Sequence, residues 1–119
     1  MITPKLRTLR LCVNDLAASK QFYRQLFGLP VHEEDDNFVS FDFGGTRLEM
    51  VGADDKNPAS TGGSIGYFEV SSIASMIEKA QQLGATIWRG PLQINDSGWT
   101  IVQIRDSAGN VIGLEGKNP

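Results

Sequence analysis

The sequence repeats its own pattern once, and this repeat restricts the possible folds more than any other feature. Each half has an alternating apolar segment, an amphipathic segment that ends at glycine, and three further segments typical of strands. Val13–Leu16 of the first half corresponds to Val70–Ile73 of the second, and Leu48–Met50 corresponds to Ile112–Leu114. A unit of this size buries only part of its apolar surface alone. We therefore expect two similar units that complete a core together.

Two segments have the period of an amphipathic helix. Apolar residues recur every three or four positions in Leu16–Phe27 and in Ile73–Leu83, and a glycine follows each segment. Residues suited to cap these helices are Asn14 or Asp15 for the first, and Ser71 or Ser72 for the second.

Strand-like segments surround each helix. The expected strands are Leu6–Val13, Leu29–His32, Phe38–Phe43 and Thr46–Val51 in the first half, and Ile65–Val70, Ala85–Arg89, Trp99–Arg105 and Val111–Glu115 in the second. The polar, turn-rich stretch 53–63 divides the halves. The 119 residues are thus predicted to form one α+β domain over 1–119, with module one at about 5–52, a linker at about 53–63 and module two at about 64–116.

Composition excludes several classes of protein. A net charge of −3 argues against a nucleic-acid surface, which needs clustered Lys and Arg. The lone Cys12 excludes an internal disulfide and a cysteine-rich zinc site, and is expected to be buried. The only histidine, His32, precedes an acidic run and is expected at the surface. No stretch approaches the roughly 20 apolar residues of a membrane span, and no signal peptide is evident, so we expect a cytoplasmic protein.

Two motifs give the chain a resemblance to a known family. One is Val13-Asn14-Asp15-Leu16 followed by Ser19-x-x-Phe22-Tyr23-x-x-Leu26-Phe27-Gly28, and the other is the ending Asp106–Leu114. In this order and within a repeat, they resemble the vicinal oxygen chelate superfamily of glyoxalase I, extradiol dioxygenases and the fosfomycin- and bleomycin-resistance proteins. The resemblance implies two βαβββ modules, forming an open, curled, mixed β-sheet barrel around a cavity. Small members are commonly homodimers.

The resemblance also implies where a metal would bind. Catalytic members use four side chains, one from the first strand and one from the last strand of each module. The motifs place these positions at Thr8, Glu49, Ile65 and Gly113, and a slip of two residues replaces Ile65 by Tyr67. Only Glu49 is a conventional ligand, whereas a catalytic zinc site needs about three protein ligands. The sequence therefore predicts no metal, no cofactor and no catalytic residue, as in the metal-free members that bind and sequester a molecule.

Strand parity predicts which side chains face the cavity. Those opposite the apolar positions should point away from the helices. The predicted ligand pocket consists of Thr8, Arg10, Arg47, Glu49, Tyr67, Glu69, Trp99, Gln103 and Glu115. The sequence leaves open which face of the sheet Trp99 and Gln103 share. It also leaves open whether the charged side chains of this set are only solvated. The sequence does not decide whether Trp88 and Trp99 stack on a ligand, pack in the core or form a dimer interface. The loop Leu92–Gly98 is a candidate lid.

Three functions remain open at this stage. The leading hypothesis is a dimeric protein that binds a small cationic or aromatic molecule without a metal. Its rival is a metal-dependent lyase, isomerase or dioxygenase that uses Glu49 with Glu69, Glu115 or Gln103. The third is a module that acts only through a partner.

Overall fold

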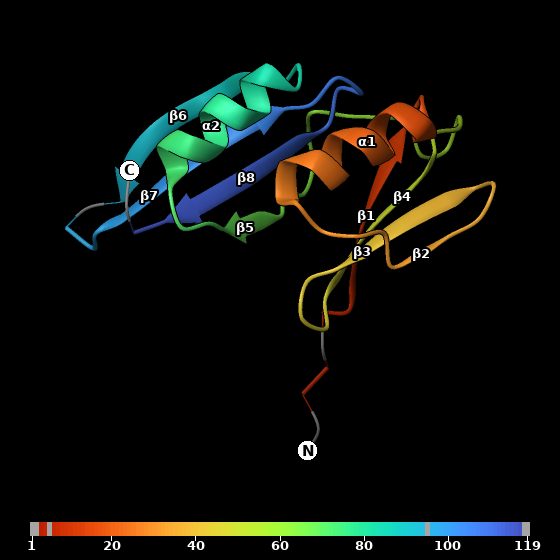
Figure 1. Cartoon of the computed structure of the whole chain (residues 1–119), viewed down its shortest axis with the longest axis horizontal. Helices are drawn as coiled ribbons and strands as arrows, with labels where there is room; N and C mark the ends of the chain where they lie inside the picture. Colours follow the sequence, from red (N-terminus) through yellow and green to blue (C-terminus); the bar gives the residue numbers. More distant parts are fainter. Residues whose placement is uncertain (1–2, 5, 95, 118–119) are drawn as a thin grey trace. The chain divides into compact units, whose positions relative to one another are not determined.

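The computed structural model describes residues 3–4, 6–94 and 96–117 (Figure 1). The chain separates into two compact units, the first ending at Ala59 and the second beginning at Ser60. Both units follow the same order of elements, strand, helix and three strands, as the internal repeat predicts.

The first unit is a four-stranded mixed sheet with one helix. Its elements are β1 (Thr8–Val13), α1 (Leu16–Phe27), β2 (Glu33–Glu34), β3 (Phe38–Asp42) and β4 (Arg47–Gly52). The strand order is β1-β4-β3-β2, with β1 parallel to β4 and the other pairs antiparallel. Helix α1 packs on the face of β3 and β4 (Figure 1).

The second unit repeats this topology. Its elements are β5 (Tyr67–Glu69), α2 (Ile73–Gln82), β6 (Thr86–Ile94), β7 (Trp99–Arg105) and β8 (Val111–Gly116). The strand order is β5-β8-β7-β6, with β5 parallel to β8 and the other pairs antiparallel. Helix α2 packs against β6, β7 and β8.

The core of the first unit lies between α1 and one face of its sheet. Asp15 caps the helix by accepting a hydrogen bond from the Ala18 amide at 3.0 Å, and Gly28 ends the helix in a left-handed conformation. Side chains buried between helix and sheet include Phe22, Tyr23, Leu26, Val39, Phe41, Leu48 and Met50. Burial of each large apolar side chain contributes about 1.5–3 kcal/mol, so this layer stabilises the packing of the sheet against the helix.

The core of the second unit is built in the same way. Ser72 caps α2 by accepting from the Ser75 amide at 3.2 Å. Ile73 and Ala80 of the helix are buried, as are Val102, Ile104, Ile112 and Leu114 of the sheet. Helix α2 therefore covers one face of this sheet. We call the opposite face, which α2 does not cover, the open face.

The predicted fold class is confirmed. The chain is α+β with two βαβββ modules, and each of its two four-stranded sheets is mixed. Neither sheet closes into a barrel within the described part of the chain. Both predicted helices are present, and the second ends one residue early, at Gln82.

Two predicted strands are misplaced. Leu29–His32 is not a strand; β2 is Glu33–Glu34, inside the acidic run that was expected to end it. The reason is the turn that follows, where the Asp35 carboxylate accepts from the amides of Asn37 and Phe38 and so fixes the pairing next to it.

The other error concerns the candidate lid. Strand β6 continues past Arg89 to Ile94, so Leu92–Ile94 belongs to the sheet and is not part of a loop. Asp96–Gly98 form a turn, and Asn95 lies outside the described residues.

Candidate functional site

The face of the first sheet opposite α1 carries the polar side chains that parity predicts. Along β4, Leu48 and Met50 are buried, while Arg47 and Glu49 are half-buried on the other side. Strand register places Thr8 beside Arg47 and Arg10 beside Glu49. This sheet therefore presents charged groups on one face and apolar groups to the helix.

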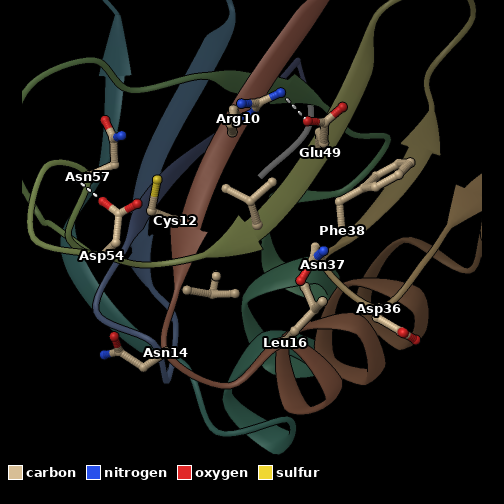
Figure 2. A pocket seen from close by; sticks show the side chains of 13 residues that line it. Arg10, Cys12, Asn14, Leu16, Asp36, Asn37, Phe38, Glu49, Asp54 and Asn57 are labelled. Atoms are coloured by element: carbon tan, nitrogen blue, oxygen red, sulfur yellow. Dashed lines mark hydrogen bonds and ion pairs between the residues drawn. The ribbon is translucent and has the colours of Figure 1, made fainter.

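A hollow of about 860 Å³ opens on this face (Figure 2). Its walls come from β1, β4, the start of β3 and the segments around Asn14, Asp36 and Asp54. The lining residues are Arg10, Cys12, Val13, Asn14, Leu16, Asp36, Asn37, Phe38, Glu49, Val51, Gly52, Asp54 and Asn57. This volume lies in the range of about 300–1,000 Å³ typical of sites for small organic ligands.

An ion pair between Arg10 and Glu49 crosses the upper wall of the hollow (Figure 2). The Glu49 side chain is 19% exposed and that of Arg10 is 59% exposed. The carboxylate is thus held in the wall, while the longer guanidinium group reaches into solvent. Because the pair is partly exposed, it adds little to stability, and Arg10 can move away from Glu49 at small cost.

The hollow combines negative charge with apolar surface. Asp36, Glu49 and Asp54 provide three carboxylates against the one guanidinium of Arg10, which leaves a net charge of −2. Phe38 supplies an aromatic wall. Such a lining suits a positively charged molecule with an apolar body.

Short turns hold two of these carboxylates in place. One Asp54 oxygen accepts from the amides of Lys56 and Asn57 at 3.0 and 2.8 Å, so the side chain closes its own turn. Asp36 lies between Asp35, which builds the β2–β3 turn, and Asn37. The loops fix the backbone positions of both groups at the rim.

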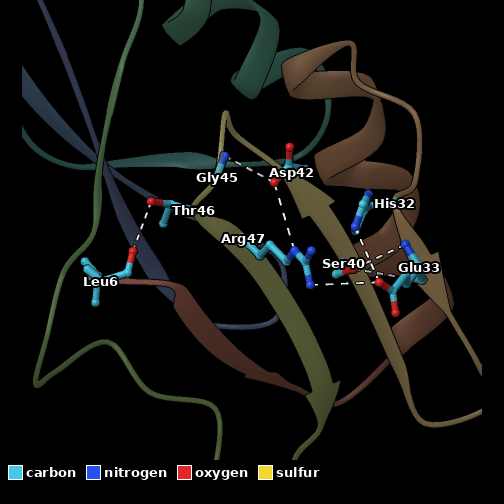
Figure 3. A network of polar contacts seen from close by, with 8 residues as sticks. All are labelled: Leu6, His32, Glu33, Ser40, Asp42, Gly45, Thr46 and Arg47. Atoms are coloured by element: carbon cyan, nitrogen blue, oxygen red, sulfur yellow. Dashed lines mark hydrogen bonds and ion pairs between the residues drawn. The ribbon is translucent and has the colours of Figure 1, made fainter. Parts of the chain in front are cut away.

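Arg47 belongs to a different polar network (Figure 3). Its guanidinium group lies 3.8 Å from Glu33 and 4.0 Å from Asp42. The Glu33 amide donates to the Ser40 hydroxyl at 3.2 Å, and His32 lies 3.4 Å from the Glu33 carboxylate. His32 is exposed, as expected. This network ties β2 to β3 and β4, and Arg47 does not line the hollow.

The open face of the second sheet is organised around a glycine. Register aligns Tyr67 with Gly113, and Gly113 with Gln103. The Tyr67 ring lies over Gly113, so a Cβ atom at position 113 would overlap with ring carbons. The ring reaches across to Gln103, whose Nε2 donates to the Tyr67 hydroxyl at 3.0 Å. This register also answers the question left open by the sequence, because it puts Trp99 and Gln103 on the open face with Gly113.

The two tryptophans are not core residues. The Lys117 ammonium lies 5.5 Å from the ring centroid of Trp99, and the Arg105 guanidinium lies 5.8 Å from that of Trp88. Trp88 is 51% exposed. Both rings therefore present cation–π contacts on the second unit.

The residues at the family's metal positions do not fit a metal. Thr8 is exposed, Glu49 is paired with Arg10, and the second module offers Ile65, or Tyr67, with Gly113. A ligand side chain at position 113 would also collide with the Tyr67 ring. Among residues 3–4, 6–94 and 96–117, no three His, Cys, Asp or Glu side chains come together as a possible metal site.

The structure distributes the nine predicted pocket residues over both open faces. Arg10 and Glu49 line the large hollow, and Tyr67 and Gln103 line a smaller one of about 230 Å³ on the second unit. The remaining five line neither of these two hollows: Thr8, Arg47, Glu69, Trp99 and Glu115.

Sequence reasoning missed several residues of the large hollow. Phe38 shares the face of Ser40 and Glu49, which strand parity could have shown. Asp36, Asp54 and Asn57 lie in turns, where parity carries no information. Cys12 was expected to be buried but is half-buried in the wall of the hollow.

Paired βαβββ modules and two open sheet faces define the class as a two-module α+β protein of the glyoxalase type. Residues 5–114 match the model of the Glyoxalase/Bleomycin resistance protein/Dioxygenase superfamily, and the chain belongs to this superfamily. The resemblance seen in the sequence is thereby confirmed.

Solved structures share the fold at low sequence identity. A glyoxalase/bleomycin resistance protein/dioxygenase family enzyme from Burkholderia phytofirmans PsJN is 18% identical, with a TM-score of 0.78 over 95% of this chain and 98% of its own. A glyoxalase/bleomycin resistance protein from Albidiferax ferrireducens T118 is 22% identical, with a TM-score of 0.75 over 92% and 97%. Lactoylglutathione lyase from Agrobacterium tumefaciens is 22% identical, with a TM-score of 0.67 over 96% and 94%. No curated protein matches the chain significantly.

Proposed function

We propose that this protein binds a small cationic organic molecule in the hollow of its first unit, without a catalytic metal. The observation that carries the proposal is the lining of that hollow, which includes three carboxylates, the ring of Phe38 and the single guanidinium group of Arg10. An incoming cation replaces Arg10 beside Glu49, so the carboxylate keeps a charged partner when solvent is excluded. Holding a toxic or antibiotic cation is a function of this kind.

The donor set supports the metal-free form of the proposal. Glu49 offers one carboxylate, and hard cations take six or more oxygen ligands or keep several waters. Arg10 beside it adds a positive charge that repels a divalent ion. A metal-dependent lyase, isomerase or dioxygenase therefore has less support than a binding protein.

A pair of variants with opposite expected effects tests the proposal. The probe is ethidium, a cationic aromatic dye, titrated by calorimetry against the native protein. Glu49→Gln should weaken binding by roughly 10- to 100-fold, because a charged contact contributes about 1.5–3 kcal/mol. Arg10→Gln should strengthen binding, because it removes the competing cation. General loss of folding weakens binding in both variants, so the opposite signs identify the hollow.

A control variant and a metal titration complete this experiment. Glu78→Gln removes an exposed carboxylate from α2 and should leave ethidium binding unchanged. Titration with Zn²⁺, Ni²⁺, Mn²⁺ and Fe²⁺ should show no stoichiometric micromolar binding. If such binding occurs and is abolished by Glu49→Gln, the metal-free proposal is wrong and the metal-dependent enzyme takes its place.

The proposal also includes the assembly and the compartment. We propose a homodimer, supported by exposed apolar side chains along β6, namely Ile87, Trp88 and Ile94. Within the described residues, no helix is long and apolar enough to cross a membrane. We retain the cytoplasm as the proposed compartment, because a lone cysteine is common among proteins of reducing environments.

A further inference from the structure

Strand β6 contains two irregularities, and Arg89 stands between them. Its register against β7 shifts between Ile87 and Arg89 and again between Arg89 and Leu92. The second shift makes Arg89 and Leu92 face the same side of the sheet, although they are three positions apart in the sequence. Gly90 has a φ of +90°, a conformation that favours glycine. Bulges of this kind often redirect a side chain next to a binding site.

The redirected Arg89 completes a row of side chains across the open face of the second sheet. It aligns with Gln103, which aligns with Gly113, which aligns with Tyr67. Because Gly113 has no side chain, the Tyr67 ring extends over it and brings its hydroxyl within 3.0 Å of the Gln103 amide nitrogen. The Tyr67 hydroxyl and the Arg89 side chain thus stand on either side of Gln103.

Tyr67 and Arg89 can each donate a further hydrogen bond. The Tyr67 hydroxyl accepts the Gln103 hydrogen bond, so its own proton remains available for another acceptor. Arg89 forms no ion pair with any carboxylate among the described residues. A guanidinium group and a phenolic proton without an acceptor among the described residues favour an anionic group between them.

A hollow of about 230 Å³ lies at this position and limits the size of the ligand. Its walls are Tyr67, Arg89, Leu92, Ile101, Val102 and Gln103. The volume is below the usual range for drug-sized ligands, so it fits a small molecule with a short apolar body against Leu92 and Ile101. The next row along the sheet holds Glu115 beside Ile101 and Glu69 beside Glu115. These carboxylates repel any anion, and the repulsion grows with the charge of the anion, so a singly charged acid is disfavoured less than a multiply charged one.

We propose that Arg89 and Tyr67 form a binding site for a small aromatic or aliphatic monocarboxylate on the second unit. Arg89 pairs with the carboxylate, the Tyr67 hydroxyl donates to it, and the apolar part of the acid contacts Leu92 and Ile101. The site differs from the cation-binding hollow in its unit, its charge and its residues. It stands or falls independently of the proposed function.

The test is titration of the intact ¹⁵N-labelled protein with benzoate, followed by NMR. Amide shifts should concentrate at residues 89, 90, 92 and 101–103, with a dissociation constant of roughly millimolar for so small a ligand. Arg89→Gln should weaken benzoate binding by roughly 10- to 100-fold. Tyr67→Phe keeps the ring over Gly113 and removes only the donor, so it should weaken binding by about 2- to 10-fold.

Matched controls separate this site from general attraction to positive charge. Arg105→Gln removes a cation from the same sheet, outside the hollow, and should leave benzoate binding within about twofold of native. Benzamide, which has the same shape without the charge, should not bind measurably. Equal losses in Arg89→Gln and Arg105→Gln, equal binding of benzamide, or no shifts on β6 and β7 would each overturn the proposal. The spectra of the free variants report whether each remains folded.

Discussion

At the scale of residues, the two motifs that resemble the superfamily are mainly structural. Asp106 is buried and accepts from the amides of Ala108 and Asn110 at 3.0 and 2.9 Å. The Asn110 side chain in turn accepts from the Ser60 amide at 3.3 Å. This motif therefore builds the β7–β8 turn and positions Gly113, but it brings no chemistry to the open face. A motif can thus identify a fold while leaving its function open.

The contact between Gly113 and Tyr67 gives a prediction at the same scale. Gly113→Ala should lower the free energy of unfolding by about 1–3 kcal/mol, because the new methyl group overlaps the Tyr67 ring. In a Tyr67→Ala background the same change should cost less than about 0.5 kcal/mol. Urea unfolding of the four proteins in this cycle measures the coupling. An equal cost of Gly113→Ala in both backgrounds would show that the ring does not occupy this space.

At the scale of elements, the sequence predicted well those segments that have one buried and one open face. Strand β4 and the second half of β7 show this most clearly, because buried residues there alternate with half-buried or exposed ones. The helices were located by the same kind of signal. Both misjudged strands, β2 and β6, lie at a sheet edge.

Edge position explains why those two strands were misjudged. Both residues of β2 are exposed, and all described side chains of β6 are exposed except at Gly90. Without a buried face there is no alternation to detect, and hydrogen bonds to a single neighbour determine the strand. The bulges that aim Arg89 depend on the same pairing. For this reason parity predicted Arg10 and Glu49 correctly on the open face but did not suggest Arg89.

A comparison of two glycines tests the conformation of β6. Gly90 and Gly98 both have positive φ, +90° and +83°. A Cβ at Gly90 would lie 3.1 Å from the Ile101 carbonyl oxygen and 3.1 Å from the Leu92 nitrogen, whereas nothing lies within 4 Å at Gly98. Both alanine variants carry a backbone cost of about 1–2 kcal/mol. Gly90→Ala should cost about 1–2 kcal/mol more than Gly98→Ala in urea unfolding, because backbone atoms cannot move away. Equal losses would mean that β6 lies farther from β7 than described.

At the scale of the whole molecule, the exposed apolar residues of β6 argue for association. An edge strand with unpaired backbone groups and several exposed large apolar side chains is a template for another chain. Trp88 is 51% exposed, Ile87 40% and Ile94 38%. A twofold axis lets the same patch cover its own copy, which is the commonest form of oligomer.

The expected particle is therefore a homodimer of about twice 13.0 kDa, measured by light scattering at tens of micromolar. Trp88→Glu places a charge in the middle of the patch and should shift the particle toward 13.0 kDa, because an unpaired charge is costly to bury in an interface. Leu6→Glu is the matched control: Leu6 is 74% exposed and belongs to the first unit, so its replacement should leave the dimer intact. A native particle of 13.0 kDa would contradict the homodimer, and a dimer that survives Trp88→Glu would place the interface away from β6.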